Sequence, residues 1–312
     1  MTDDEQSLAV RAAWLHYVGG LTQSAVAKKL GVPSVKAHRL IARAVADGVV
    51  KVSIDGEIAE CAALEAALAE TYGLAFCEVA PELDDDPQAL IALGQLGGSF
   101  LRREIERGEH AVIGLGHGST LSAAVHILPR ISAGATKFVS LLGGLTRNYA
   151  ANPYDVMHRI AEKTGAQAYV MPVPFFANTE EDREVLLAQK GVREVFRLAE
   201  SADLKLVGIG TVDYAARLFQ SGMLEKDEID DVSRRGGVGE MLGHFFDRHG
   251  RMLDTTVSQR TLAARFSEGR KDRIVAIAGG QAKTEAIRAV LHSHSLNGLI
   301  TDEGTARRLL GR

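Results

Sequence analysis

Apolar and polar positions alternate at helical spacing along the first fifty residues. Apolar side chains recur every three or four residues from Leu8 to Val18, which predicts an opening helix over about residues 6–19. The same period returns after residue 21 and is interrupted once, at Gly31. A glycine suits a tight turn because the backbone there takes a shape that side chains resist. The pattern predicts three helices, the last two joined as a helix-turn-helix.

The second and third helices carry the polar face that is typical of a DNA-binding motif. Thr22 is placed to cap one helix, and Ser34, which follows the helix-stopping Pro33, is placed to cap the next. A short polar and basic helix after a tight turn fits a DNA major groove. We expect these side chains to meet DNA: Thr22, Gln23, Ser34, Lys36, His38, Arg39 and Arg43, with Lys28 and Lys29 on the phosphate backbone.

The charge of the chain is divided unevenly between this region and the remainder. Residues 11–53 hold seven Lys or Arg against one Asp, a net charge of +6, and the acidic residues 3–5 reduce residues 1–53 to +3. The whole chain carries −4, so the remainder carries −7. A solvated basic face on a small helical domain is the plain alternative. Together with the helix-turn-helix pattern, the asymmetry favours a part that meets phosphates and a part that does not.

From about residue 74 the pattern changes to short apolar runs that alternate with helical stretches. The strands that we expect cover residues 75–80, 111–116, 138–143, 168–173, 204–210 and 274–279. This alternation predicts an α/β fold, with an open, mostly parallel sheet covered by helices on both faces. Residues 222–252 are less regular and indicate an insertion or a flap.

The junction between the two parts has its own signals. Residues 49–54 are β-rich and indicate a short wing on the DNA-binding module. Residues 57–72 predict a linker helix, which packs against its copy in a dimer or against its own body. We therefore expect a helix-turn-helix domain over 1–56, a linker helix over 57–73 and a larger Rossmann-like domain over 74–312.

Composition limits the remaining possibilities. The chain contains no run of 18 apolar residues, and its acidic start lacks the apolar core of a secretory signal. Its two cysteines, Cys61 and Cys77, have neither metal nor redox spacing. No catalytic triad is evident in the sequence. We expect a cytoplasmic protein that needs no metal, no cofactor and no membrane.

Four glycine-rich segments follow predicted strands, at residues 114–120, 143–152, 208–213 and 279–283. The carboxyl ends of parallel strands share one edge of a sheet, and ligands bind there. The first segment lacks the spacing of a dinucleotide fingerprint or a P-loop. Lys283 lies at a predicted helix start, where a cation is unfavourable. Its side chain therefore points to solvent or serves a bound phosphate or carbonyl.

Motifs along nearly the whole chain resemble those of SorC-family transcriptional regulators. They are Arg11–Tyr17, Leu21–Gln23, Gly114–Thr120, Leu142–Gly144, Gly208–Gly210, Phe245–Asp247, Ala278–Lys283 and Gly298–Ala306. The resemblance implies a bacterial regulator whose head binds double-stranded operator DNA. It implies an effector domain, similar to sugar-phosphate isomerases and CoA-transferases, that binds a sugar, a polyol or its phosphate. It also implies dimers or tetramers, and within the family the chain is most similar to repressors of polyol (erythritol-type) catabolism.

The same resemblance implies the effector-binding residues. They would be Gly116, His117, Gly118, Ser119, Thr120, Gly144, Arg147, Asn152, Asp213 and Lys283. Gly116, Gly118, Ser119 and Thr120 would cradle phosphate or hydroxyl groups. Asp213 would bind hydroxyls, and Lys283 would meet a phosphate or carbonyl oxygen. Glu240 and Asp254 are further candidates. His117 and Ser119 differ from many members, which leaves the preference for phosphate open.

Two functions stay open at this point. The first is an effector-controlled transcription factor, with or without a Schiff base at Lys283. The second is a sugar-phosphate isomerase-like enzyme with a helical assembly domain, which needs an acid/base pair such as Asp213 and His117. Turnover of sugar phosphates separates the two.

Overall fold

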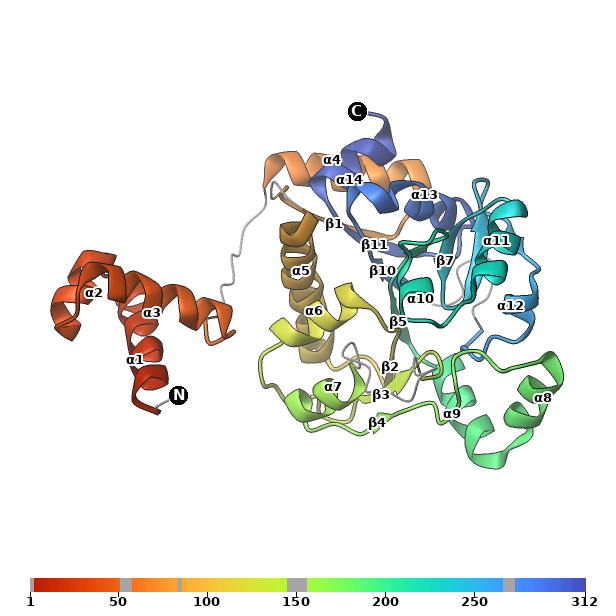
Figure 1. Ribbon diagram of the computed structural model, residues 1–312, viewed down its shortest axis with the longest axis horizontal. Helices are drawn as coiled ribbons and strands as arrows, with labels where there is room; N and C mark the ends of the chain where they lie inside the picture. The colour runs from red at the N-terminus through yellow and green to blue at the C-terminus, as the bar shows by residue number, and fades with distance from the viewer. Residues whose placement is uncertain (1–2, 51–57, 83–85, 145–155, 266–272) are drawn as a thin grey trace. The chain divides into compact units, whose positions relative to one another are not determined.

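The computed structural model describes residues 3–50, 58–82, 86–144, 156–265 and 273–312 of the 312-residue chain. The chain forms two compact units, Met1–Gly56 and Glu57–Arg312 (Figure 1). Arg147, Asn152 and the predicted wing, apart from Val49 and Val50, lie outside the described residues.

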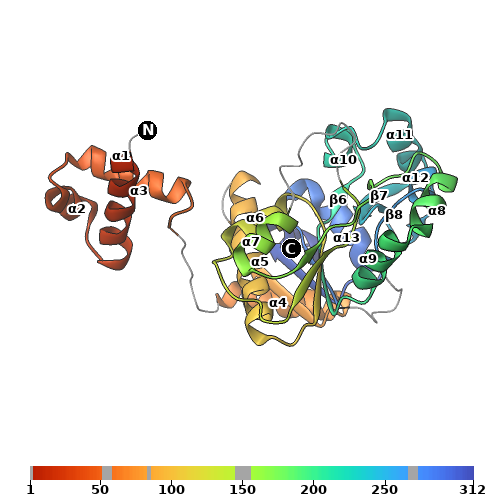
Figure 2. The ribbon, with the colours of Figure 1, turned by 90° about the horizontal axis from the view of Figure 1, so that it is seen from below.

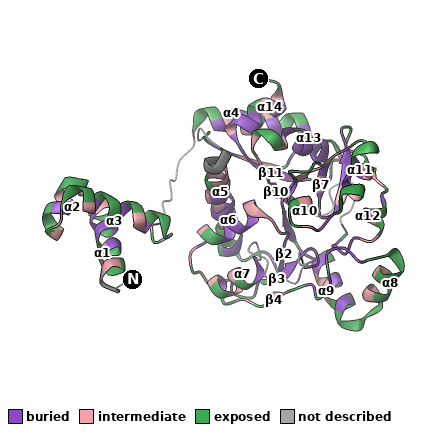
Figure 3. Ribbon diagram, in the orientation of Figure 1, coloured by how far each residue is buried: buried purple, intermediate pink, exposed green. Residues whose placement is uncertain are grey.

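The first unit is a small helical domain. Its elements are α1 (Asp3–Ala13), a π-helical turn (Trp14–Val18), α2 (Gln23–Leu30) and α3 (Ser34–Ala46). Its core consists of buried alanines with Leu15, Val26, Leu40 and Ile41. Apolar residues at helical spacing pack inward, which leaves the polar face of each helix in solvent (Figure 3).

The turn between α2 and α3 confirms two sequence predictions and corrects a third. Thr22 caps α2, because its Oγ1 accepts a hydrogen bond from the N–H of Ala25 at 3.2 Å. Gly31 has a φ of +65°, the left-handed conformation that glycine adopts at little cost. Ser34 was expected to cap α3, and this is wrong. Pro33 occupies that position, and Ser34 is the first helical residue.

The second unit is built on a seven-stranded parallel sheet of order β1-β11-β10-β5-β2-β3-β4. The strands are β1 (Phe76–Ala80), β2 (Val112–Leu115), β3 (Lys137–Ser140), β4 (Ala168–Tyr169), β5 (Leu204–Val207), β10 (Ile274–Ile277) and β11 (Gly298–Asp302). The six expected strands are present but mostly shorter. The strand β11 was not among the expected strands, although it lies within the motif Gly298–Ala306.

Helices cover both faces of this sheet, as expected (Figure 2). One core joins the sheet to α5 (Asp86–Arg107), α6 (Ser119–Ile127) and α7 (Met157–Thr164). The other joins it to α4 (Ala59–Tyr72), α9 (Lys190–Glu200), α13 (Thr284–His292) and α14 (Glu303–Leu310). The connections leaving β2 and β5 run in opposite directions along the sheet. A crevice for ligands is expected between two such strands.

Residues 222–252 are more regular than the sequence suggested. They form the helix α11 (Lys226–Arg234) and the strands β7 (Gly237–Met241) and β8 (His244–Asp247). The two strands pair with β6 (Gly210–Thr211) and β9 (Met252–Leu253) in an antiparallel sheet of order β6-β7-β8-β9. Short helices α10 (Arg217–Gln220) and α12 (Thr256–Gln259) flank these strands in sequence. The remaining helix, α8 (Glu180–Ala188), has no buried residue.

The expected linker helix, α4, packs on its own body. Its apolar side chains Cys61, Leu64 and Leu68 are buried in the core of the second unit. The hydroxyl of Tyr72 donates to the carbonyl of Leu309 at 3.1 Å, which ties α4 to α14. This face of α4 is therefore unavailable to a second copy. Among the described residues, we find no helix of the length and apolarity that a membrane span requires.

Candidate DNA-reading helix and effector site

The exposed side of α3 carries most of the residues expected to meet DNA. Ser34, His38 and Arg39 are exposed and Lys36 is half-buried, while Ala37, Leu40 and Ile41 hold the helix on its core. Thr22 and Gln23 are exposed at the start of α2. The structure thus brings these six positions, and Arg43 as the seventh, onto α3 and the start of α2 in one small unit.

Two residues of α3 differ from the expectation. The side chain of Arg43 lies 3.7 Å from Glu5 Oε2 and 3.5 Å from Asp47 Oδ2, so its charge is already paired within the unit. Val35 was not among the residues expected to meet DNA, but it is 80% exposed. An exposed valine beside Ser34 can contact a thymine methyl group in the major groove. The signal for this was available, because Val35 stands in the first turn, ahead of the buried stripe.

Three glycine-rich loops meet at the carboxyl ends of β2 and β5. Gly118 begins α6 with a φ of +126°, and Thr120 is buried behind it. A Cβ added to Gly208 would lie 3.5 Å from His117 O and 3.7 Å from Thr120 Oγ1, so the loop after β5 lies against the loop after β2. The N–H groups at the start of α6 can bind an anion here.

His117 connects the loop after β2 to the end of β3. Its Nε2 lies 3.2 Å from Ser140 Oγ, and Ser140 Oγ donates its own proton to Leu142 O at 2.6 Å. Ser140 is fully buried. Because the hydroxyl proton is already used, Nε2 of His117 acts as the donor in this pair. His117 therefore helps to fix the loop.

Lys283 does not point into open solvent. Its Nζ donates to the carbonyl of Ile209 at 2.9 Å, which joins the loop after β10 to the loop after β5. The preceding Gly280 is held by the buried Asp302: its N–H lies 2.8 Å from Asp302 Oδ2. Asp302 also accepts the N–H of Thr305 at 2.7 Å and caps α14. Sequence reasoning gave Asp302 no role, although an Asp before a helix is a typical cap.

The turn between β7 and β8 completes this edge. Leu242 Cδ2 would lie 3.6 Å from a Cβ on Gly116, and Glu240 Oε2 would lie 2.6 Å from a Cβ on Gly210. Glu240 Oε1 accepts the N–H of Gly243 at 2.6 Å. Burial raises the pKa of Glu240 to about 7, although this N–H and the charge of Lys283 act in the opposite direction.

Three other residues expected at the effector site, Gly144, Asp213 and Asp254, form hydrogen bonds with their own neighbouring segments. Gly144 pairs with the segment around Pro174: its N–H donates to Val173 O at 2.8 Å. Asp213 is exposed, and its Oδ1 accepts the N–H of Ala215 at 2.7 Å. Asp254 is exposed, and its Oδ1 accepts from Gln259 at 3.1 Å. Within the described ranges, no three His, Cys, Asp or Glu side chains are placed to hold a metal ion.

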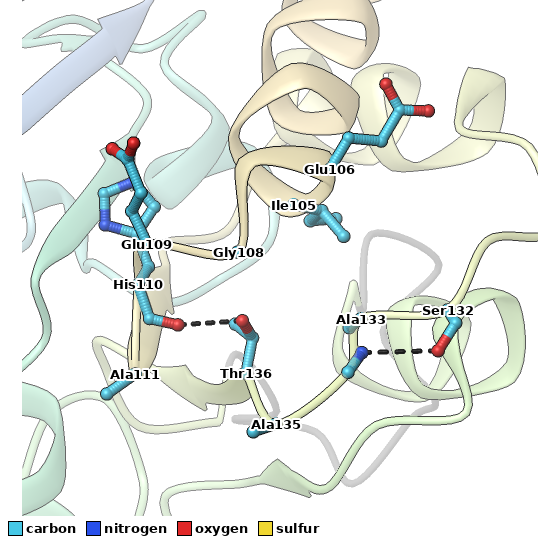
Figure 4. A pocket seen from close by; sticks show the side chains of 11 residues that line it. Ile105, Glu106, Gly108, Glu109, His110, Ala111, Ser132, Ala133, Ala135 and Thr136 are labelled. Atoms are coloured by element: carbon cyan, nitrogen blue, oxygen red, sulfur yellow. Dashed lines mark hydrogen bonds between the residues drawn. The ribbon is translucent and has the colours of Figure 1, made fainter.

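A hollow of about 750 Å³ opens at the opposite edge of the sheet, at the amino ends of β2 and β3 (Figure 4). Two of its lining residues, Thr136 and His110, are engaged with the protein. Thr136 Oγ1 donates to His110 O at 2.7 Å, and His110 Nε2 lies 2.7 Å from the buried carboxylate of Glu104. Arg107 and Arg273 also donate to Glu104, each at 2.7 Å. This arrangement ties α5 to the strands and lies away from the carboxyl-end loops.

Known proteins match this chain along most of its length. The family model described as "Putative sugar-binding domain" matches residues 56–311. The chain is 64% identical over 312 residues to the erythritol catabolism regulatory protein EryD of Brucella abortus (strain 2308), covering 100% of this chain and 99% of that protein. It is 32% identical over 311 residues to the transcriptional regulator LsrR of Klebsiella pneumoniae, covering 98% and 93%.

A solved structure extends the match to the whole architecture. The crystal structure of the full-length sorbitol operon regulator SorC from Klebsiella pneumoniae has a TM-score of 0.72 and 27% identity, and covers 99% of this chain and 100% of that one. The match includes the helical unit as well as the α/β unit. The family resemblance noted in the sequence is thereby confirmed, and regulation is favoured over the isomerase-like alternative. The chain belongs to the SorC family of sugar-binding transcriptional regulators.

Proposed function

We propose that this protein binds the operator of a polyol catabolic operon and changes its affinity for that DNA when a polyol of the erythritol type, or its phosphate, binds. The observation that carries the proposal is the full-length identity of 64% to an erythritol catabolism regulator. At this identity, with both units covered, both the DNA-binding and the ligand-binding parts are expected to keep their roles.

The helical unit supports the DNA-binding part of the proposal. Ser34, Val35 and Arg39 are exposed on α3, so a helix of this kind can present them to base edges. Lys36, His38, Thr22 and Gln23 complete the surface, and Arg43 contributes only if its pairs with Glu5 and Asp47 open. The net charge of +3 over residues 1–53 favours phosphates, and the −7 of the remainder disfavours a second DNA contact there.

The carboxyl edge of the sheet supports the effector part. The start of α6, the ammonium of Lys283 and the carboxyl of Glu240 each lie against the segment Gly208–Gly210 that follows β5. This set offers donors and acceptors, and a polyol needs both because each hydroxyl donates and accepts. Lys283 and Glu240 already have partners within the protein, so an effector that binds these two side chains must exchange hydrogen bonds with them. Such an exchange gives the ligand a preference for one conformation of the loops.

The decisive experiment measures operator binding by fluorescence anisotropy with the full-length protein. The probe is a duplex from the promoter of the polyol operon that the protein is proposed to control. Titrations run without ligand, with erythritol, with its phosphates and with glucose as an unrelated control. A change in operator affinity of about 5–150-fold that is specific to the polyol or its phosphate is expected, since this is the usual range of allosteric coupling. Equal affinity in every titration would contradict the proposal.

The number of chains that bind one operator duplex is tested separately. We propose that the protein acts as a dimer or a tetramer, because helix-turn-helix regulators bind paired half-sites. Sedimentation with and without the operator duplex is expected to give a mass of two or four chains. A single chain per duplex at saturating protein would contradict this part.

A further inference from the structure

An apolar stripe runs along the outer side of α1 and the π-helical turn that follows it. It consists of Val10, Trp14, Tyr17 and Val18, which are 42%, 58%, 48% and 68% exposed. These residues stand three or four positions apart, so their side chains are neighbours on one face of the helix. The other side of α1 packs on the core through buried alanines. The stripe therefore faces away from the core of its own unit.

The π-helical turn fixes the shape of this stripe. The N–H of Gly19 donates to Trp14 O at 3.0 Å, which is the five-residue hydrogen bond of a π-helix. Nδ1 of His16 lies 2.7 Å from Leu21 O and is the donor, because a carbonyl oxygen only accepts. The His16 ring contacts the Tyr17 ring edge-on, with their centroids 4.8 Å apart. π-Helical turns are rare and are found frequently at functional sites.

The size of the stripe limits what can cover it. Its four side chains expose roughly 400 Å² per copy, and patches of this size are often functional. Contact between two copies of the stripe would bury about 800 Å², less than the roughly 1,200 Å² that a stable interface between free proteins needs. A separate partner protein therefore needs more surface than the stripe offers. Two helical units held close, on paired half-sites or within one assembly, need less because their effective concentration is high.

The chemistry of the stripe also suits contact with its own copy. In a two-fold contact the same patch lies on both sides, so a charged residue in the patch would approach a like charge. All four residues of the stripe are uncharged. The apolar face of α4, which was the surface first considered for pairing, is buried in its own unit.

We propose that the stripe Val10, Trp14, Tyr17 and Val18 is the contact between the helical units of two copies of this chain. The contact would hold the two α3 helices in a fixed relation, as paired half-sites require. The half-sites rest on the proposed function, whereas the contact itself rests on the exposed stripe.

Trp14 is the only tryptophan of the chain, so its fluorescence reports this surface alone. The test is the quenching of that fluorescence by acrylamide in the full-length protein, with and without the operator duplex. Sedimentation of the same samples, over a range of protein concentrations, gives the number of chains per particle. Quenching is expected to be several-fold weaker in particles of two or more chains than in single chains, because contact between two stripes excludes the quencher.

Two variants separate the contact from general effects of a new charge. Val18→Asp places a carboxylate in the stripe, and Val185→Asp places one on α8, at a valine of similar exposure, as the matched control. Both positions are on the surface, so both proteins should fold, and thermal melting checks this. Val18→Asp is expected to leave Trp14 open to acrylamide, whereas wild type and Val185→Asp protect it in particles of two or more chains. Equal quenching of the three proteins in such particles would overturn the proposal.

Other ways of covering the stripe give different outcomes, and each contradicts the contact between copies. Protection of Trp14 in a dilute single chain shows that the same chain covers it, and protection in one chain on a single half-site shows that DNA does. A protein that remains a single chain at every concentration and on the full duplex has no copy for the stripe to meet. Protection that needs two chains and is lost in Val18→Asp supports the contact. If such a protein never responds to polyols on DNA, the result counts against the proposed function alone.

Discussion

Asp302 Oδ2 lies 2.8 Å from the backbone nitrogen of Gly280, so a buried carboxylate at the end of β11 holds the loop that leads to Lys283. The same oxygen accepts the hydroxyl of Thr305 at 2.8 Å, and Oδ1 accepts the N–H of Thr305. Gly279 has no space for a side chain, because an added Cβ would lie 2.0 Å from Asp302 Oδ2. A glycine is therefore needed at position 279 because of the Asp302 carboxylate, whether or not a ligand binds the loop.

Replacing Asp302 by Asn is expected to keep the cap of α14 and to weaken the link to Gly280. An amide oxygen can still accept the N–H of Thr305, but the NH₂ group then faces the N–H of Gly280, which keeps only Thr305 Oγ1, at 2.9 Å, as an acceptor. We expect a loss of about 1–3 kcal/mol in unfolding free energy and weaker effector binding, measured by urea unfolding and by calorimetry well below the melting temperature. Thr305→Ser keeps the hydroxyl and is expected to behave as wild type. Unchanged effector affinity in Asp302→Asn would contradict the positioning role.

Glu240→Gln is expected to change how stability depends on pH. The pKa of Glu240 is raised from 4.5 to about 7, so between these values the folded state holds a proton that the unfolded state has lost. The protonated carboxyl therefore stabilises the fold below pH 4.5, and this contribution is lost as the pH rises towards 7. The free energy of unfolding of wild type minus that of the variant should fall by up to about 3 kcal/mol over this range.

The difference in unfolding free energy between wild type and Glu240→Gln isolates the contribution of Glu240. The stability of wild type alone does not, because the titration of His244 changes stability with pH in the opposite direction. Its pKa is lowered from 6.5 to about 4, so its contribution is lost as the pH falls through that range. Urea unfolding of both proteins at pH 5, 6, 7 and 8 measures the difference directly. A difference that does not vary with pH would show that Glu240 ionises normally.

Arg39→Ala is expected to cost roughly 1–3 kcal/mol of operator affinity if Arg39 contacts a base. The loss should then disappear on DNA of unrelated sequence. If Arg39 contacts only phosphate, the loss is equal on all sequences and the salt dependence of binding becomes shallower. Arg11→Ala, which removes an exposed charge from α1, is the control. If Arg39→Ala binds the operator as tightly as wild type, the side chain of Arg39 does not contact the DNA.

Val35→Ser is expected to weaken operator binding without weakening the fold. Val35 is 80% exposed, so its replacement should change stability by less than about 0.5 kcal/mol. The apolar contact with a thymine methyl group would be lost, and affinity for the operator but not for random duplex should fall. Val45→Ser, at the other end of α3 and 45% exposed, is the matched control. Equal affinities of the two variants would show that Val35 does not contact DNA.

Local pattern was enough to find the three helices of the first unit, the cap at Thr22 and six strands of the parallel sheet. Thr22, Gly31 and the alternation of short strands with helices act through neighbours in the sequence, and periodicity records such neighbours directly. Ser34 was misplaced by one position because proline can itself stand before the first helical residue. The strand Gly298–Asp302 was missed because periodicity alone does not distinguish a short apolar strand from a buried helical segment.

The sequence by itself determined that a basic helix-turn-helix is joined to a parallel α/β unit, since both are encoded by local spacing and composition. Tertiary structure decided which distant groups meet: Asp302 with Gly280, Lys283 with Ile209, and Arg183 with Thr261. These partners stand 22, 74 and 78 positions apart, so no local period connects them. Burial is the main cause of the shifted pKa values of Glu240 and His244. Because burial arises only from tertiary packing, these shifts could not be predicted from the sequence pattern.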